Sequence, residues 1–253
     1  MGQLDGKVAI VTGGGRGLGR AYCEALAAEG AAVVAADIRD TAETVAAVEA
    51  AGGRIIGVPL DVADMESCSA MAGAALAAFG RIDVLVNNAA LYGDISGGRF
   101  DKLSDDQWDR VMTVNVKGIW QCCKACVPAM REAEGGSIVN ISSLAATYGM
   151  AYAVDYATSK AAVIGMTRSL ARELGRDWIR VNAVAPSAVQ TEGTDEFMGE
   201  KRDGMMDAIA QGQSLKSNLD PSDMTGTIVY LASDASRFVT GQTIMVDGGT
   251  VML

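Results

Sequence analysis

The sequence predicts an α/β fold, in which helices cover both faces of a doubly wound, parallel, seven-stranded sheet. Two observations carry this prediction. Short apolar runs rich in β-branched residues alternate with longer alanine- and leucine-rich segments of helical period, as in repeated βαβ units. The runs are apolar throughout instead of alternating with polar residues, as expected of strands that helices cover on both sides.

The strands are expected where these apolar runs occur. In chain order they are residues 8–13, 32–37, 55–61, 84–89, 137–142, 180–186 and 243–248. Parallel neighbours need right-handed crossovers, and 64–79 and 154–175 are the clearest helical segments between them. The pattern is that of a Rossmann-type sheet, which binds ligands at the carboxyl ends of its strands.

Residues 1–253 are expected to form a single domain, because no linker, charge run or internal repeat divides the chain. The alternation of strand and helix segments is interrupted only at 187–220, where glycines, acidic residues and amides interrupt weak helical signals. Long excursions at the carboxyl end of a strand often cover a ligand crevice. We therefore expect a substrate lid at about 187–220.

The charge balance narrows the class of partner. The chain has 31 acidic and 21 basic residues and a formal net charge of -10, which argues against nucleic acid or an anionic membrane as the main partner. No apolar run reaches the roughly 18 residues of a membrane span, and the first residues lack the features of a signal peptide. A small-molecule substrate and a cytoplasmic location are expected.

The residue types present also limit the chemistry. The chain has no histidine, which excludes Ser-His-Asp triads and histidine-bearing zinc sites. Three of its five cysteines crowd into residues 122–126. A structural zinc needs four ligands, so we expect buried reduced thiols and no metal site.

A glycine-rich turn follows the first strand. In "TGGGRGLG" the strand ends at Gly13 and glycines recur at Gly17 and Gly19, with Arg16 and Leu18 beside them. Such a turn exposes backbone N–H groups at a helix N-terminus, which attract a pyrophosphate. The spacing differs from the common G-x-G-x-x-G, so a turn that only packs strand on helix is the alternative.

The ends of the next two strands offer carboxylates. Asp37, followed by Ile38, can accept hydrogen bonds from the adenosine ribose and would repel a 2′-phosphate, which favours NAD over NADP. Arg16 and Arg39 are nearby cations that soften this preference. At the third strand, Asp61 and Val62 can hold the adenine amino group, or belong to the N-cap region of helix 64–79.

Tyr156 and Lys160 in "YATSK" lie one helical turn apart and are candidates for acid/base chemistry. Bringing a phenol from a pKa of about 10 to about 7 takes about 4 kcal/mol. An ammonium about 4 Å away supplies roughly that amount at an effective dielectric of about 20. The alternative is a chance pair of polar residues on a helix.

Six short motifs together resemble the short-chain dehydrogenase/reductase family in order and spacing. They are "TGGGRGLG", "NNAA" at 87–90, "NVKG" from Asn115, "ISS" ending at Ser143, "YATSK" and "APSAVQT" at 185–191. The resemblance covers essentially the whole chain, through "GQTIMVDGG" at 241–249.

The resemblance implies a role for each matching residue. Tyr156 would be the general acid/base, and Lys160 would lower its pKa and bind the nicotinamide ribose. Ser143 would bind the substrate oxygen while Ser142 is structural, and Asn115 would kink its helix and hold a water of the proton relay. The further cofactor contacts it implies are Asn88, Ala89, Pro186, Val189 and Thr191. Two positions, Ala90 and Ser187, depart from the family's glycine, and Ser187 affects the shape of the substrate pocket.

The expected substrate pocket lies between the loop that starts at Leu91, the segment after Ser143 and the lid. Its residues are Ser143, Ala145, Tyr148, Met150, Tyr152, Ser187 and Met198, with Leu144, Phe197, Met205 and Met206 near them. Apolar and thioether side chains suit an aryl or bulky secondary alcohol, and "APSAVQTEGT" resembles dehydrogenases of the 1-phenylethanol type. Alternatively, the lid residues only pack against the sheet.

The expected function is therefore NAD-dependent interconversion of a secondary alcohol and a ketone. A sugar or polyol, a steroid and a 3-oxoacyl thioester are alternative substrates, and a non-catalytic NAD-binding regulator is an alternative of another class. The resemblance implies a homotetramer, with interfaces at helices 104–133 and 154–175 and at the C-terminal strand. The apolar ending "VML" agrees with burial at a subunit contact.

Overall fold

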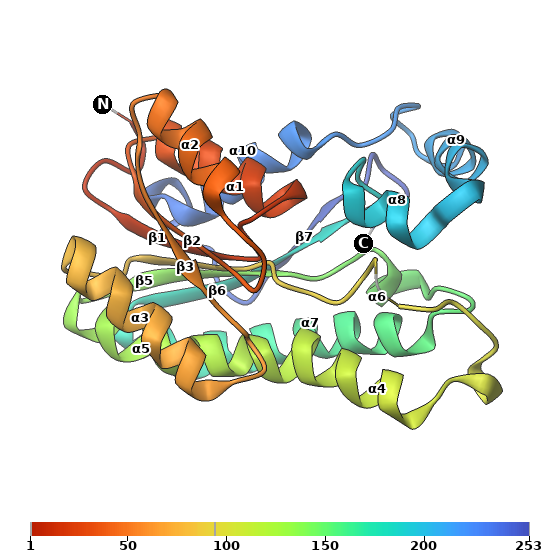
Figure 1. Ribbon diagram of the computed structural model, residues 1–253, viewed down its shortest axis with the longest axis horizontal. Coiled ribbons are helices and arrows are strands. Elements are labelled where there is room, and N and C mark those ends of the chain that lie inside the picture. Colours follow the sequence, from red (N-terminus) through yellow and green to blue (C-terminus); the bar gives the residue numbers. More distant parts are fainter. Residues whose placement is uncertain (1, 94, 253) are drawn as a thin grey trace.

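Seven parallel strands form one central sheet in the computed structural model, which describes residues 2–93 and 95–252 (Figure 1). The strands are β1 (Val8–Thr12), β2 (Ala32–Asp37), β3 (Arg54–Pro59), β4 (Val84–Asn87), β5 (Gly136–Ile141), β6 (Ile179–Pro186) and β7 (Thr243–Val246). Their order across the sheet is β3-β2-β1-β4-β5-β6-β7, and every pair is parallel. The fold predicted from the sequence is confirmed.

The strand order reverses between β1 and β4, which are neighbours with Val11 opposite Val86. From β1 the chain builds outward through β2 and β3, and then returns to add β4 to β7 on the other side. The loops after β1 and β4 therefore leave the sheet in opposite directions. A crevice opens at such a point, at the carboxyl ends of the strands.

Helices cover both faces of the sheet (Figure 1). One layer consists of α1 (Gly17–Ala28), α2 (Ala42–Ala50) and α10 (Pro221–Ala232). The other consists of α3 (Met65–Phe79), α4 (Asp105–Met112), α5 (Gly118–Glu132) and α7 (Val154–Leu174). Each layer buries its own apolar core against the sheet, around Tyr22 and Met224 on one face and Met71 and Met130 on the other.

Three helices lie at the carboxyl end of the sheet instead of on its faces. They are α6 (Ala145–Tyr148), α8 (Glu192–Met198) and α9 (Arg202–Gly212), and short 3₁₀ turns occur at Phe100–Lys102, Gly175–Asp177, Gly199–Lys201 and Asp234–Ser236. Residues 187–220, expected to have only weak helical signals, thus contain two helices. Val189 bridges to Leu219, which joins the two ends of this segment beside the sheet.

The element boundaries differ from the prediction mainly where the chain leaves the sheet. Gly13, Asp61 and Asn88 were expected inside strands but lie in the turns that follow them. The expected long helix 104–133 is divided, because a π-helical turn at Thr113–Lys117 separates α4 from α5. None of the helices in the described part of the chain is long and apolar enough to cross a bilayer.

Candidate active site

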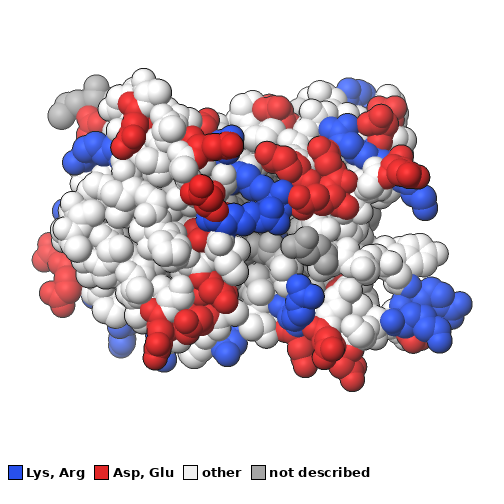
Figure 2. Space-filling view, in the orientation of Figure 1, with Lys and Arg blue, Asp and Glu red and all other residues white. Residues whose placement is uncertain are grey.

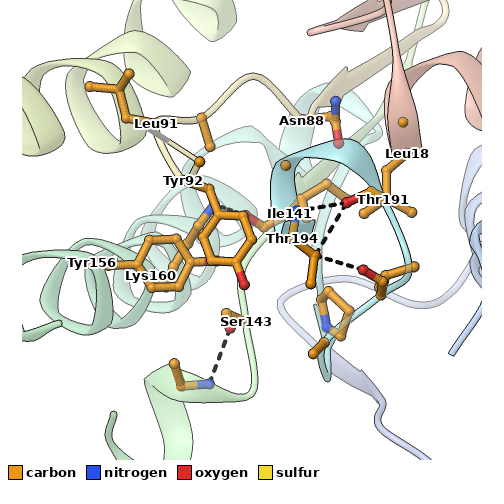
Figure 3. Close-up of a pocket in the computed structure, with 18 of the residues that line it drawn as sticks. Leu18, Asn88, Leu91, Tyr92, Ile141, Ser143, Tyr156, Lys160, Thr191 and Thr194 are labelled. Carbon is orange, nitrogen blue, oxygen red and sulfur yellow. Dashed lines mark hydrogen bonds between the residues drawn. The ribbon is translucent and has the colours of Figure 1, made fainter. Parts of the chain in front are cut away.

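A cavity of about 800 Å³ opens at the carboxyl ends of the strands. All the residues predicted to bind the cofactor line it, although they come from six separate segments. They are Gly13, Arg16, Gly17, Leu18, Gly19, Asp37, Ile38, Asp61, Val62, Asn88, Ala89, Tyr156, Lys160, Pro186, Val189 and Thr191. Figure 3 shows Tyr92, Tyr156, Lys160 and Ser143 on one side of this cavity, with Thr191 and Thr194 on the other.

The glycine turn permits a close approach of backbone segments. Gly13 and Gly17 have φ values of 67° and 52°, a region that favours glycine. A Cβ on Gly19 would lie 1.8 Å from the Gly13 carbonyl oxygen, so only glycine lets α1 begin this close to β1. The alternative, a turn that only packs strand on helix, accounts for this closeness but not for the cavity beside it.

The N-terminus of α1 fits the phosphates of a dinucleotide. Its N-cap, Arg16, makes no side-chain capping bond, and its first turn contains no acidic residue. Gly17, Leu18 and Gly19 therefore present backbone N–H groups at the positive end of the helix dipole, directly on the cavity. The donor set and the space in front of it suit a pyrophosphate.

Asp37 is fixed at the end of β2 by its own hydrogen bonds. Its two carboxylate oxygens accept the N–H groups of Gly15 and Arg39, each at 2.9 Å, and only 9% of the residue is exposed. A carboxylate has about four acceptor positions, which is more than these two N–H groups use. Asp37 therefore also positions the glycine turn, a contact that the sequence did not suggest.

Two roles were considered for Asp61 and Val62, namely contact with the adenine or capping of the next helix, and the structure assigns the cap to Asp64. Asp64 is the N-cap of α3, and its side chain accepts the N–H of Glu66 at 3.0 Å. Asp61 instead accepts the N–H of Ala63 at 2.8 Å and lines the cavity. The Val62 carbonyl accepts a hydrogen bond from Gln121 on α5 at 2.7 Å, which fixes the backbone of this wall.

Thr12 organises the loop after β4 and was not predicted as a site residue. Its hydroxyl accepts the N–H groups of Asn88 and Ala89, both at 3.0 Å. The Asn88 amide in turn donates to the carbonyls of Thr12 and Gly13, at 3.0 and 3.2 Å. The only sequence signal was the threonine directly before the glycines.

Tyr156, Lys160 and Ser143 meet on the opposite wall. Lys160 donates through Nζ to the Ile141 carbonyl at 2.9 Å, and Nζ lies 5.7 Å from the centroid of the Tyr156 ring. The Ser142 hydroxyl donates to the Lys160 carbonyl at 2.8 Å, which agrees with the structural role expected of it. The Ser143 hydroxyl accepts the N–H of Ala145 at 3.1 Å and lies beside the Tyr156 phenol.

The electrostatics of this wall differ from the sequence-based estimate. Burial raises the pKa of Tyr156, the Tyr92 phenol adds to that effect and the Ser143 hydroxyl opposes it. Burial lowers the pKa of Lys160 to about 8. The expectation that Lys160 alone brings the phenol pKa near 7 does not hold for the polypeptide by itself, because burial of the phenol raises its pKa.

Asn115 lies behind the cavity wall and does not line the cavity. It is fully buried within the π-helical turn Thr113–Lys117, so the helix is irregular at the residue where a kink was expected. Its Oδ1 accepts the Leu91 N–H at 2.7 Å, and its Nδ2 donates to the Leu91 carbonyl and to Ser159 Oγ, at 3.2 and 3.1 Å. Ser159 donates onward to the Tyr156 carbonyl at 2.7 Å, which links this turn to α7.

Six of the seven residues predicted for the substrate side line the cavity. They are Ser143, Ala145, Tyr148, Met150, Ser187 and Met198. Tyr152 does not line it, and this prediction is wrong. The backbone of Tyr152 is left-handed, with φ 65°, and its side chain is 69% exposed beside a separate hollow of about 260 Å³. The segment 187–220 contributes Met205 to the cavity, whereas Met206 is buried elsewhere.

Tyr92, in the loop after β4, is a further cavity residue that the prediction did not single out. Its ring lies 5.2 Å from that of Tyr156 and stacks at 4.8 Å on Phe197 of α8. It therefore bridges the wall that carries Tyr156 and the segment 187–220. An aromatic residue in a loop directly after a strand was the only sequence signal.

The cysteines do not take part in the cavity. All five are buried and none forms a disulfide, with Cys68 and Cys122 Sγ atoms 3.8 Å apart between α3 and α5. Burial raises the pKa of Cys123 to about 12 and also raises that of Cys126. Within residues 2–93 and 95–252, no group of three or more acidic residues, cysteines or histidines could hold a metal ion.

Comparison with known proteins identifies the family. A family model described as enoyl-(acyl carrier protein) reductase matches residues 13–251. The 3-oxoacyl-(acyl-carrier-protein) reductase FabG of Thermotoga maritima is 38% identical over 252 residues, which cover 99% of this chain and 100% of that protein. The chain belongs to the short-chain dehydrogenase/reductase family and is an oxidoreductase of that family.

Solved structures agree with this assignment. Carveol dehydrogenase from Mycobacterium avium, in complex with NAD, superposes with a TM-score of 0.94 at 33% identity, covering 99% of each chain. A structure from Beutenbergia cavernae with NADP bound at low occupancy has a TM-score of 0.90 at 37% identity, covering 98% of this chain and 97% of the other. Similar structures thus contain either form of the dinucleotide.

Proposed function

We propose that the protein interconverts a secondary alcohol and a ketone with NAD as the cofactor. The observation that carries this proposal is that Tyr156, Lys160 and Ser143 share one cavity with the glycine turn and Asp37. An acid/base group, an oxygen-binding hydroxyl and a dinucleotide cradle are the parts that hydride transfer at a carbinol carbon needs.

Each residue has a proposed role in the oxidation direction. The Tyr156 phenolate removes the hydroxyl proton, and the Ser143 hydroxyl donates a hydrogen bond to the substrate oxygen. NAD, when bound, supplies the hydride acceptor and a positive charge on the nicotinamide ring. The Lys160 ammonium stabilises the phenolate, and its pKa of about 8 keeps it mostly protonated at neutral pH. The proton then leaves through Lys160 and a water held at the turn around Asn115.

NAD is proposed over NADP because Asp37 faces the ribose end of the cavity. Its carboxylate is held in place by two backbone N–H groups, so it cannot turn away from a 2′-phosphate without breaking them. Equal or better kcat/KM with NADP would contradict this preference. In reduction the same residues act in reverse, with Tyr156 as the proton donor.

The proposed substrate is an aryl or bulky hydrophobic secondary alcohol, bound under a lid formed by residues 187–220. Its support is the lining of the substrate end, where Tyr92, Met150, Met198 and Met205 present aromatic and thioether side chains. The relationship to carveol dehydrogenase makes carveol a reasonable member of a substrate panel.

The test is an absorbance assay at the reduced-nicotinamide band with a panel of 1-phenylethanol, carveol, a polyol, a steroid alcohol and a 3-hydroxyacyl thioester. Tyr156→Phe is expected to lower kcat by at least about a thousandfold, because the proton acceptor is lost. Tyr148→Phe removes a hydroxyl from the same cavity, at a residue that is largely exposed, and should change kcat by less than about threefold. Turnover that persists in Tyr156→Phe would exclude the proposed acid/base role.

A second candidate is reduction of a 3-oxoacyl thioester, which the 38% identity to FabG favours. Asp37 and the formal charge of -10 speak against it, since acyl-carrier-protein substrates call for a basic docking surface. The thioester in the panel separates the two candidates. Binding of NAD without turnover of any substrate would instead support a non-catalytic NAD-binding regulator.

A homotetramer stays a proposal. Its support is the exposure of large apolar side chains on the expected interfaces, with Trp120 on α5, Val154 on α7 and Met252 near the C-terminus. Leu253, the last residue of "VML", lies outside the described residues. Size-exclusion chromatography with light scattering measures the assembly state, and the cytoplasmic location likewise stays a prediction.

A further inference from the structure

An ion pair joins the lid segment to the glycine turn. The Arg16 guanidinium donates to both carboxylate oxygens of Glu196 on α8, at 2.5 and 2.7 Å. The two residues are 180 positions apart in the sequence, so only the fold brings them together. Bidentate pairing of this kind fixes both side chains in one geometry.

Gly93, in the loop after β4, makes room for this pair. A Cβ at position 93 would lie 2.3 Å from Glu196 Oε2 and 2.9 Å from Glu196 Cβ. Any side chain there would displace Glu196 from Arg16. Three separate segments thus meet around the Glu196 carboxylate.

Arg16, the basic partner of the pair, lies at the end of the cavity where the adenosine ribose is proposed to bind, and lines it together with Asp37, Ile38 and Arg39. The hydrogen bond from Arg16 lowers the pKa of Glu196, and the field of Arg39 adds to that effect. Figure 2 shows basic side chains gathered near the middle of this face with acidic side chains on both sides. An arginine beside the ribose is the group that accommodates a 2′-phosphate, so the charges around Arg16 decide what it can bind.

We propose that Glu196 is a cofactor-specificity residue, which neutralises Arg16 and thereby disfavours a dinucleotide that carries a 2′-phosphate. The inference rests on the proposed function, in that the cavity binds a nicotinamide dinucleotide. It assigns part of the selectivity to the lid segment instead of to the end of β2 alone. Glu196 acts through Arg16 and does not take part in the chemical step.

The test is isothermal titration of the full chain with NAD and with NADP. Glu196→Gln is expected to lower the ratio of the NADP to the NAD dissociation constant by about tenfold, mainly through tighter NADP binding. Glu200→Gln is the matched control, because it removes the same charge from an exposed position on the adjacent turn Gly199–Lys201, and should shift the ratio less than about twofold. In the Arg16→Gln background, Glu196→Gln should give little of this gain.

The dependence of NADP binding on ionic strength tests whether Glu196 acts through its charge, because a purely structural role of Glu196 would not depend on salt. The side chains of Arg16 and Glu196 are 30% and 38% exposed, so salt screens them, and the gain in NADP binding should shrink as salt rises. An unchanged ratio in Glu196→Gln, or an equal shift in Glu200→Gln, overturns the inference and leaves the proposed function intact. Failure of the unmodified protein to bind either dinucleotide overturns both.

Discussion

The two ends of the cavity are lined by different kinds of groups. At the dinucleotide end, the contacts come from backbone groups and short side chains: the glycine turn, the Thr12 hydroxyl and the Asp37 carboxylate. At the substrate end they come from long side chains on separate helices and loops, such as Tyr92, Met198 and Met205. The shape of the dinucleotide end is therefore set by the backbone conformation. The shape of the substrate end is set by side chains that come together from different elements.

The two ends of the cavity are expected to differ in how well they tolerate amino-acid substitutions. A backbone cradle admits almost no substitution, because an added Cβ collides with main-chain atoms that cannot rotate away. A wall of flexible side chains can be repacked, since methionine and aromatic residues adapt to neighbours of similar volume. We therefore expect mutations at the dinucleotide end to affect folding and binding together, and those at the substrate end to affect substrate selection alone.

The largest expected effect is that of Gly19→Ala. The new Cβ would lie 1.8 Å from the Gly13 carbonyl oxygen, so α1 must move away from the turn. We expect a loss of about 3 kcal/mol in the free energy of unfolding, at the upper end for overpacking, and loss of NAD binding. Urea denaturation and calorimetric titration measure the two effects.

The control for that substitution is Gly73→Ala on α3. A Cβ there meets nothing within 4 Å, and the residue is exposed, so alanine should stabilise the helix by about 0.5 to 1 kcal/mol. If Gly19→Ala folds and binds NAD like the unmodified protein, the rigid-cradle account of this end is wrong.

Lys160 lies where the two ends of the cavity meet. Its burial should make the free energy of unfolding depend on pH, by about as much as Gly19→Ala changes it. Its folded pKa of about 8 is below the unfolded value of about 10.4, so the folded state binds fewer protons between those two values. Burial of the ammonium thus costs stability below pH 8, and this cost disappears as pH rises from about 8 to 10.4. The difference between the folded and unfolded pKa of Lys160 corresponds to about 3 kcal/mol.

Lys160→Met should remove this pH-dependent contribution. The difference in unfolding free energy between the unmodified protein and Lys160→Met, from urea denaturation at several pH values, should change by about 3 kcal/mol across that window. Lys124→Met removes the same charge at an exposed position on α5 and serves as the matched control. A difference for Lys160→Met that does not vary with pH would show that burial does not depress the pKa of Lys160.

The dinucleotide end was predictable from the sequence because its motifs are local. Gly13, Gly17 and Gly19 fall within one turn, and Asp37 follows from the position of a strand end. The alternation of strand segments with helical segments along the chain also predicted the fold. Five of the seven predicted strands ran one or two residues too far at their carboxyl ends, because the residue pattern does not show where the last ladder hydrogen bond forms.

The substrate end was less predictable because long-range contacts decide it. No local signal shows that Tyr92 stacks on Phe197. The same limit applies at the dinucleotide end, where Glu196 reaches Arg16 from 180 positions away. Tyr152 was misplaced because its left-handed backbone turns the side chain toward solvent, and composition does not reveal φ. The pKa of Tyr156 was misjudged because pairwise Coulomb attraction was estimated without the cost of desolvation.

The smallest expected effect separates Tyr92, at the substrate end, from Tyr152, which lies outside the cavity. Tyr92→Ala removes a ring that contacts both Tyr156 and Phe197, and should raise KM for a bulky alcohol about tenfold while NAD binding stays within about twofold. Tyr152→Ala, at a residue that does not line the cavity, should leave KM unchanged. If Tyr92→Ala weakens NAD binding as much as substrate binding, the two ends are coupled through α8, and the separation of a rigid dinucleotide end from an adaptable substrate end fails.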